Sequence, residues 1–194
     1  MLLLATKNKH KMEEIKRFVP KDLKVVTLDD VGIDQEIEEN GETFMENASK
    51  KAIFYANLSS LPTIADDSGL VIDALNGFPG IRSARFMPDA SYNEKMQMIL
   101  RMLEGKTNRN ARFVCAASYY DPKEKLLVCV EGTVEGHISK EIRGNFGFGY
   151  DPIFVPAGFS KTFGELGEEK HTMSHRYKAF SKLFSILNAI ILAK

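Results

Sequence analysis

The sequence has few cysteines, no excess of either charge and no long apolar run, and each absence excludes a class of protein. Only two cysteines occur in 194 residues, and Cys115 and Cys129 both lie in apolar strand-like runs. A small buried thiol is the expected state there, rather than a disulfide or a metal ligand. The 26 basic residues balance 26 acidic ones, so no overall charge attracts a nucleic acid or an anionic membrane. We therefore expect a cytoplasmic protein with neither nucleic acid nor membrane as a partner.

The apolar stretches are short as well. The longest nearly apolar stretch, Leu183 to Ala193, is interrupted by Ser185 and Asn188, whereas a bilayer span takes about 20 apolar residues. The apolar residues before Lys7 are too few for a signal peptide. A hydrophobic content of 44% suffices for a buried core, and we expect one domain over residues 1–194.

Hydrophobic periodicity predicts strands and helices in alternation, followed by a long hairpin. Helices are expected over 8–18, 43–58, 91–103 and from 174 onward, and strands over 1–6, 24–28, 63–65, 70–75, 111–120, 126–138 and 153–155. In this interpretation residues 66–69 separate the third strand from the fourth. The order predicts a mixed α/β fold with a central sheet flanked by helices, divided into two lobes.

Charge is segregated along this neutral chain. From Lys7 to Lys24 there are seven Lys or Arg residues against three acids, and from Val25 to Ser49 there are eight acids and no basic residue. A metal-bound polyphosphate needs both signs nearby, because the cation takes carboxylates and the remaining phosphate charge takes Lys, Arg or backbone N–H groups. Taken alone, such charge runs are more typical of solvated faces, but the motifs below favour a phosphate site here.

Residues 6–11 begin the first predicted helix directly after a buried strand. Free N–H groups at such a helix start can hold phosphate, and Thr6, Asn8 and Lys11 add hydrogen bonds and a charge. A capped helix with surface lysines explains this segment equally well by itself.

Asp66 and Asp67 follow a predicted buried strand, where two carboxylates are costly unless a cation or donors compensate them. Mg²⁺ takes a few hard oxygen ligands and shares the rest with substrate phosphates. Glu38 or Glu39 could supply the other protein ligand. The alternative is a turn capped by Asp66 with Asp67 in solvent.

Residues 147–152 form a glycine-rich loop with two aromatic faces and one acceptor, able to stack a base. Asn145 and Pro152 interrupt the RNA-binding pattern that this segment superficially resembles, and Pro152 stands where a dinucleotide-binding loop would begin a helix. Further along, Lys170 suits phosphate and Arg176 presents a donor fork for a carbonyl or phosphate oxygen. His175 alone is more typical of capping or packing.

Together these motifs resemble the inosine triphosphate pyrophosphatase family, also called XTP/dITP diphosphohydrolases. Segments that match in the family's order, over residues 2 to about 180, are 5–11, 65–70, 77–81 with 83–86, 146–154, and 169–170 with 174–176. Lys7 departs from the pattern, since many relatives carry glycine there. The resemblance implies an elongated mixed α/β sheet whose two lobes flank a substrate cleft.

The resemblance also implies the activity and the residues that carry it. ITP, dITP and XTP would be hydrolysed to monophosphate and pyrophosphate by a magnesium-dependent homodimer. Asp67 would be the general base and would bind Mg²⁺ with Glu38. Substrate would be bound by Thr6, Lys7, Asn8, Lys9, His10, Lys11, Lys50, Ser68, Phe148, Gly149, Tyr150, Asp151, Lys170, His175 and Arg176.

The implied chemistry is attack of water on the α-phosphorus, with Asp67 deprotonating the water and with magnesium and lysines neutralising the phosphates. One rival is a nucleotide-binding regulator without turnover, against which the presence of Asp67, Glu38 and Lys170 argues. Another is a single-strand RNA-binding module. A nearer rival is a related pyrophosphatase acting on pyrimidine or methylated nucleotides.

Overall fold

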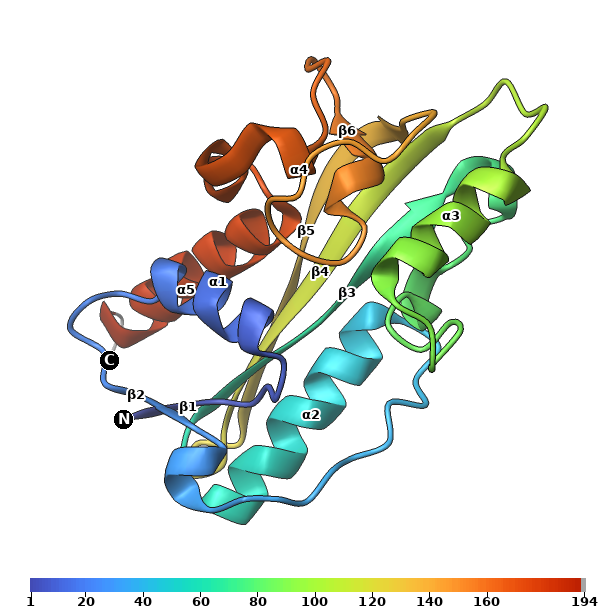
Figure 1. Cartoon of the computed structure of the whole chain (residues 1–194). Helices are drawn as coiled ribbons and strands as arrows, with labels where there is room; N and C mark the ends of the chain where they lie inside the picture. Colours follow the sequence, from blue (N-terminus) through green and yellow to red (C-terminus); the bar gives the residue numbers. More distant parts are fainter. Residues whose placement is uncertain (193–194) are drawn as a thin grey trace. The chain divides into compact units, whose positions relative to one another are not determined.

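The computed structural model describes residues 1–192, so Ala193, at the end of the long apolar stretch, lies outside the described residues. Figure 1 shows the arrangement of the elements. The strands are β1 (Leu2–Leu4), β2 (Val25–Thr27), β3 (Thr63–Ile72), β4 (Asn110–Asp121), β5 (Leu126–Ile138) and β6 (Phe154–Pro156), and the α-helices are α1 (Lys9–Phe18), α2 (Phe44–Ser59), α3 (Tyr92–Met102), α4 (Phe163–Leu166) and α5 (His175–Leu192).

The strands form a mixed six-stranded sheet in the order β2-β1-β3-β4-β5-β6. β1 pairs in parallel with β2 and β3, whereas β5 and β6 are antiparallel. The connection between β4 and β5 has only four residues, too few for the crossover that a parallel pair requires, so these strands form the expected hairpin. The predicted mixed α/β fold with a central sheet flanked by helices is confirmed.

The chain divides into two compact units. Unit 1 comprises Met1–Asp67, Cys115–Gly132 and the chain from His175, and unit 2 comprises Ser68–Val114 and Thr133–Ser174. Because β3, β4 and β5 each contribute residues to both units, neither unit is a continuous stretch of chain. The single domain over 1–194 and the substrate cleft stay predictions. Among the described residues, no helix is long and apolar enough to cross a membrane.

In unit 1 the pleat of the strands sends alternate side chains to two different helical layers. Leu2, Leu4 and Ile64 belong to the cluster that contains side chains of α1 and α5, two helices that contact each other. Leu3 and Ala65 belong instead to the cluster that contains side chains of α2. Asp66 lies two positions after Ile64, and Asp67 lies two positions after Ala65. Asp66 is therefore expected to face α1 and α5, and Asp67 to face α2.

Unit 2 has a core of its own, rich in aromatic residues. Phe113, Phe154 and Phe163 pack together, with ring centroids 4.6 to 6.0 Å apart. The helix α3 begins at a capping box, in which Ser91 accepts from the backbone of Glu94 and the Glu94 carboxylate accepts from the backbone of Ser91. This core supports the glycine-rich loop that precedes β6.

The predicted separation of strand 63–65 from strand 70–75 is wrong. β3 runs without a break from Thr63 to Ile72, and residues 63–67 are all buried. Two acids and a glycine disfavour a strand, but the burial of residues 63–67 and the position of β3 between β1 and β4 in the sheet override that propensity. Asp66 and Asp67 are consequently successive positions of one strand, with side chains on opposite faces.

The helix starts agree with the sequence-based expectation. Asn8 caps α1 by accepting from the Lys11 N–H at 3.1 Å, and Thr43 caps α2 by accepting from the Glu46 N–H at 3.1 Å. Capping fixes where each helix begins, and hence which side chains point toward the acid pair of β3.

Candidate active site

Asp66 is the centre of a buried charge cluster on the face of β3 that α1 and α5 cover. Lys11 on α1 lies 3.1 Å from Asp66 Oδ2, and Arg176 on α5 places its Nε 3.4 Å from the same oxygen. Arg176 also pairs with the carboxylate of Glu14 on α1. Burial by itself disfavours the charged form of Asp66, but Lys11, Arg176 and Lys51 outweigh it and hold the pKa of Asp66 well below its usual range.

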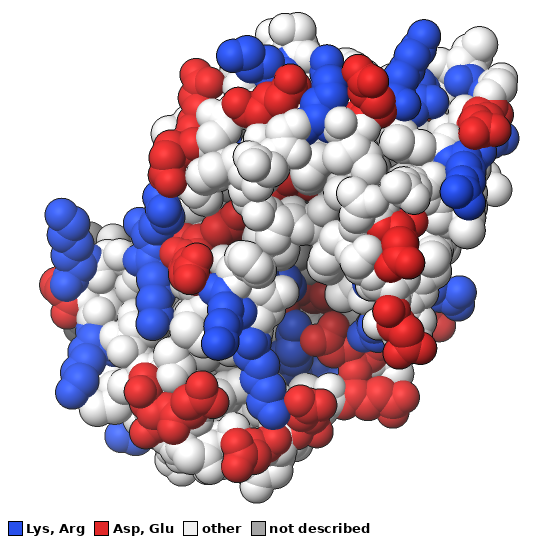
Figure 2. Space-filling view, in the orientation of Figure 1, with Lys and Arg blue, Asp and Glu red and all other residues white. Residues whose placement is uncertain are grey.

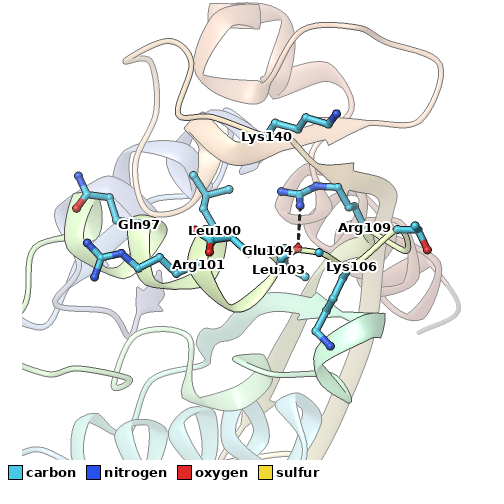
Figure 3. A pocket seen from close by; sticks show the side chains of 10 residues that line it. Gln97, Leu100, Arg101, Leu103, Glu104, Lys106, Arg109 and Lys140 are labelled. Atoms are coloured by element: carbon cyan, nitrogen blue, oxygen red, sulfur yellow. Dashed lines mark hydrogen bonds between the residues drawn. The ribbon is translucent and has the colours of Figure 1, made fainter.

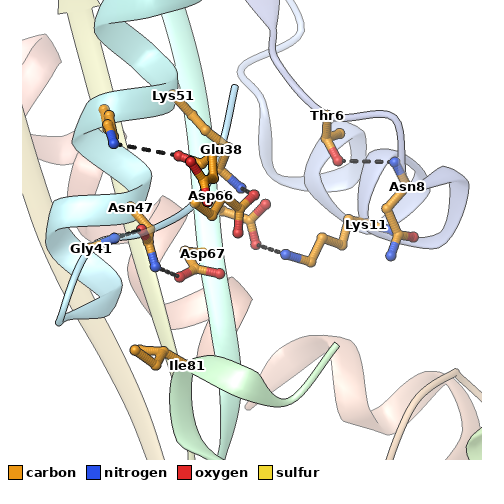
Figure 4. Close-up of polar contacts among 12 residues, drawn as sticks. Thr6, Asn8, Lys11, Glu38, Gly41, Asn47, Lys51, Asp66, Asp67 and Ile81 are labelled. Atoms are coloured by element: carbon orange, nitrogen blue, oxygen red, sulfur yellow. Dashed lines mark hydrogen bonds and ion pairs between the residues drawn. The ribbon is translucent and has the colours of Figure 1, made fainter. Parts of the chain in front are cut away.

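Asp67 faces α2 and is in a different electrostatic state. Its Oδ2 accepts a hydrogen bond from Asn47 Nδ2 at 3.0 Å, and only 5% of the residue is exposed. Burial raises the pKa of Asp67 and the negative charge of Glu39 adds to the effect, while Lys51 and Lys11 offset only part of it. Two adjacent carboxylates thus differ in basicity because they face different layers; Lys11 and Asn47 reach them from opposite sides in Figure 4.

The lysine that faces the acid pair is Lys51. Its amine lies 2.8 Å from Glu39 Oε1, with only 12% of the side chain exposed. Burial disfavours the ammonium form, but Asp66, Glu39 and Asp67 outweigh burial and raise the pKa of Lys51. The neighbouring Lys50 is exposed and donates to Asn40 and to the carbonyl of Glu38.

The structure also separates Glu38 from Glu39, which the sequence left as alternatives. Glu38 is exposed, whereas Glu39 is half-buried and paired with Lys51. Glu39 also contributes to the pKa of Asp67. The position next to the acid pair is therefore that of Glu39.

The expected phosphate segment lies at the start of α1. The Thr6 hydroxyl accepts from the N–H of Asn8 at 3.1 Å, and Lys9 and His10 are exposed in the first turn. Lys7 points elsewhere, because its amine binds Glu36 at 3.0 Å and the carbonyl of Asp34 at 2.9 Å. Within this segment Lys11 is the residue that contacts the acid pair.

The predicted base-binding loop belongs to unit 2, where Asp151 organises it. One carboxylate oxygen of Asp151 accepts from the backbone N–H of Phe148 at 3.0 Å and binds Lys170 Nζ at 2.7 Å. Gly147 has φ +77°, and a Cβ at that position would collide with the Asp151 carboxylate. The ammonium of Lys170 lies 5.2 Å from the centroid of the Phe148 ring.

The other residues predicted to bind substrate, namely Tyr150, Gly149, Ser68 and His175, are buried or half-buried. Tyr150 is buried and donates its hydroxyl to the carbonyl of Ser83 at 2.5 Å, and Gly149 lies beside it with φ +65°. Ser68 is half-buried in β3, directly after Asp67. His175 is buried in the first turn of α5, next to Arg176.

Three residues of the unit 1 cluster were not predicted from the sequence: Glu14, Asn47 and Lys51. The signal for the last two was present in the periodicity of α2. Phe44, Ala48, Ala52 and Tyr55 define its buried face, and positions 47 and 51 belong to the same stripe at helical spacing. A polar residue in an apolar stripe of this kind indicates a buried partner.

Unit 2 also contains a cavity of about 590 Å³, formed by the end of α3, residues 103–109 and Lys140 (Figure 3). None of the residues predicted from the sequence lines it. Arg109 donates to the carbonyls of Ile138, Leu103 and Ser139 at 2.8, 3.4 and 2.6 Å. This guanidinium fastens the end of α3 to the end of β5.

The charges that remain on the surface are mixed. On the face seen in Figure 2, Lys and Arg side chains are interspersed with Asp and Glu and form no continuous basic area. An electrostatic footprint for a nucleic acid requires such an area. Basic and acidic residues are therefore separated along the sequence but not over this face of the molecule.

The fold and the two clusters define a mixed α/β protein with a buried centre of carboxylates and lysines on β3 and a separate aromatic loop. The model of the Ham1 family matches residues 2–186. The chain is 44% identical to the dITP/XTP pyrophosphatase of Dictyoglomus thermophilum, over 97% of this chain and 95% of that protein. It is 43% identical to the dITP/XTP pyrophosphatase of Bacillus subtilis, over 96% of each chain.

Solved structures agree with this result. The structure of a HAM1 protein from Coxiella burnetii superposes with a TM-score of 0.88 at 36% identity, over 97% of this chain and 98% of that one. The structure of the Staphylococcus aureus Ham1 protein gives a TM-score of 0.88 at 37% identity, with the same coverage. The chain belongs to the Ham1 family.

Proposed function

We propose that this protein hydrolyses deaminated purine nucleoside triphosphates, namely ITP, dITP and XTP, to the monophosphate and pyrophosphate. The curated relatives named above are dITP/XTP pyrophosphatases and match over nearly their whole length. The observation that carries the proposal is the asymmetry of the acid pair. Asp66 is held as a carboxylate by three cations, whereas the pKa of Asp67 is raised, as a general base requires.

In this proposal Asp67 orients the attacking water and takes its proton, while the water oxygen attacks the α-phosphorus and pyrophosphate leaves. Lys11 and Lys51 neutralise charge on the phosphates, as buried ammonium groups do more effectively than exposed ones. Thr6, Asn8, Lys9 and His10 add donors at the start of α1. Neither cysteine is a suitable nucleophile, because burial raises the pKa of both thiols.

The oxygen donors present fit Mg²⁺ as the cofactor. The carboxylates of Asp67 and Glu39, which contact Asn47 and Lys51 of α2 respectively, are hard ligands of the kind that Mg²⁺ prefers. Two such ligands would leave the remaining coordination positions to water and substrate phosphates. Bound there, Mg²⁺ supplies charge neutralisation and polarises a phosphoryl oxygen. Glu38, the ligand that the sequence favoured, becomes the alternative to Glu39.

We assign the base to the aromatic loop of unit 2. Phe148 presents a ring for stacking, while Gly149, Tyr150 and Asp151 shape the loop. Lys170 supports that ring from within, since it is 1% exposed. For Arg176 we propose, from the family resemblance, a donor role toward the 6-oxo group of the base; in this structure its guanidinium is bound to Asp66 and Glu14.

A homodimer and a cytoplasmic location complete the proposal. The first rests on the family resemblance and on large apolar side chains left exposed, including Leu58 and Leu127. The second is supported by Cys115 and Cys129, both of which are free thiols. Light scattering after size exclusion gives the oligomeric state directly.

The experiment that tests the proposal is a screen of nucleoside triphosphates for pyrophosphate release with Mg²⁺. ITP, dITP and XTP should have the highest kcat/KM values, with ATP far below them. A preference for pyrimidine or methylated nucleotides would assign the fold to a different substrate, and binding without any turnover would make the protein a nucleotide-binding regulator.

A further inference from the structure

Asn47 occupies a place in α2 where an apolar residue is expected. It lies on the buried stripe of that helix with Phe44, Ala48 and Ala52 and is 0% exposed. An amide at such a position lowers stability unless its donor and its acceptor are both satisfied. Asn47 is not needed as a helix cap, because the Thr43 hydroxyl already accepts from the N–H of Glu46 in the first turn.

Both ends of the Asn47 amide are engaged, each by a different part of the site. Nδ2 donates to Asp67 Oδ2 at 3.0 Å, and Oδ1 accepts from the backbone N–H of Gly41 at 2.8 Å. The orientation of the amide is unambiguous, because a carboxylate oxygen can only accept and a backbone N–H can only donate. Asp in this position would lack the donor, and Leu would lack both groups.

Gly41 closes the acidic loop that carries Glu38 and Glu39. A Cβ at Gly41 would lie 2.7 Å from Asn47 Oδ1 and 2.9 Å from the Cβ of Glu46, so any other residue at this position would displace the Asn47 amide or the loop. The adjacent N–H of Glu42 donates to Glu46 Oε2 at 2.7 Å. Side chains of the first turns of α2 thus bind successive N–H groups of the loop.

We infer that Asn47 is a positioning residue that fixes the Asp67 carboxylate and the acidic loop at residues 38–42 to the same helix. The inference rests on the proposed function, in which Asp67 acts on the attacking water. Asn47 holds one carboxylate oxygen of Asp67 against α2, which fixes the orientation in which the carboxylate would meet the attacking water. The same amide sets how far the acidic loop stands from Asp67.

Two substitutions separate the two contacts. Asn47→Asp keeps an acceptor for Gly41 and loses the donor to Asp67, while Asn47→Ala loses both. Gly41→Ala adds a Cβ that pushes the side-chain amide of Asn47 away from the loop. The residues Asn47 and Asp67 themselves are not altered in this variant. Asn57→Asp, on the exposed side of α2, is the matched control.

The measurements are kcat and KM for ITP, the melting temperature, and the exchange rate of the Gly41 amide in ¹⁵N-labelled protein without substrate or metal. Loss of a hydrogen bond to a charged group predicts that kcat falls about tenfold or more in both Asn47 variants, with KM changed less than about threefold. Gly41→Ala should lower kcat in the same way. The Gly41 amide should exchange at least about tenfold faster in Asn47→Ala and remain protected in Asn47→Asp.

Several results would overturn the inference. The first is a kcat within about twofold of wild type in Asn47→Ala and Gly41→Ala. The second is a loss of kcat that merely follows a fall in melting temperature and is matched by Asn57→Asp. If the Asn47 variants fail to fold, an unchanged kcat in Gly41→Ala decides against it. If the wild type releases no pyrophosphate, the proposed function fails. An unchanged exchange rate of the Gly41 amide in Asn47→Ala would separately refute the hydrogen bond between Gly41 and Asn47.

Discussion

Asp66 and Asp67 are adjacent in β3, yet their carboxylates contact different helices. Asp66 meets Lys11 of α1 and Arg176 of α5, and Asp67 meets Asn47 of α2. The alternation of a strand is the cause. It gives one carboxylate that its cations keep ionised and a second whose pKa is raised, as the proposed general base requires.

The first prediction concerns Asp67→Asn, which keeps the shape of the side chain and removes the base. We expect kcat to fall roughly a hundredfold or more, in line with the loss of general base catalysis. Folding should survive, because a buried carboxylate with a raised pKa is replaced by a neutral amide. Turnover at saturating Mg²⁺ together with circular dichroism checks this, and near-normal turnover would show that Asp67 is not the base.

The second prediction compares neighbouring lysines. Lys51→Met removes the cation that Glu39, Asp66 and Asp67 share, and we expect a loss of about 3 kcal/mol in the free energy of unfolding. Lys50→Met, on the exposed side, should cost less than about 0.5 kcal/mol. Urea denaturation of both variants measures the difference. Equal losses would mean that the carboxylates do not depend on Lys51.

The third prediction is a thermodynamic coupling between Arg176 and Glu14. Arg176→Met removes the cation that pairs with Glu14 and one of the three cations around Asp66, at a cost of about 3–5 kcal/mol. Adding Glu14→Gln to that variant should recover part of the loss, giving a coupling energy of about 1–3 kcal/mol in a double-mutant cycle. Strictly additive losses would contradict the ion pair.

The fourth prediction separates the proposed base-reading role of Arg176 from its ion pairs. Arg176→Lys keeps the charge for Asp66 and Glu14 but loses the planar donor fork. If the fork reads the 6-oxo group, kcat/KM for ITP and XTP should fall by about tenfold or more while the value for ATP changes little. An equal proportional loss for ITP, XTP, GTP and ATP would make Arg176 a residue of structure or phosphate binding.

Much of this could be predicted from the sequence where the signal is local. Asn8 was recognisable as a cap because capping depends on residues within one turn, and the β4–β5 hairpin was recognisable from two apolar runs and a short polar turn. The strand break was predicted wrongly because the sequence Asp66 to Gly69 has the composition of a turn. Only its burial and the position of β3 between β1 and β4 in the sheet make it a strand.

The choice between neighbouring residues needed the fold. Lys50 and Lys51 differ by about 100° around the helix axis, and only the helix start and the buried face of α2 show that Lys51 points toward the acids. Glu38 and Glu39 lie in a loop whose path depends on contacts with Asn47, Lys50 and Lys51. Contacts between segments distant in the sequence, such as Arg176 with Glu14, leave no periodic trace.

The most direct test of the account is hydrolysis of ITP by the wild-type protein in water enriched in ¹⁸O. Attack of water on the α-phosphorus, with Asp67 as the base, places the label in the monophosphate and leaves pyrophosphate unlabelled. Label in pyrophosphate, or diphosphate and orthophosphate as the first products, would contradict the proposed reaction.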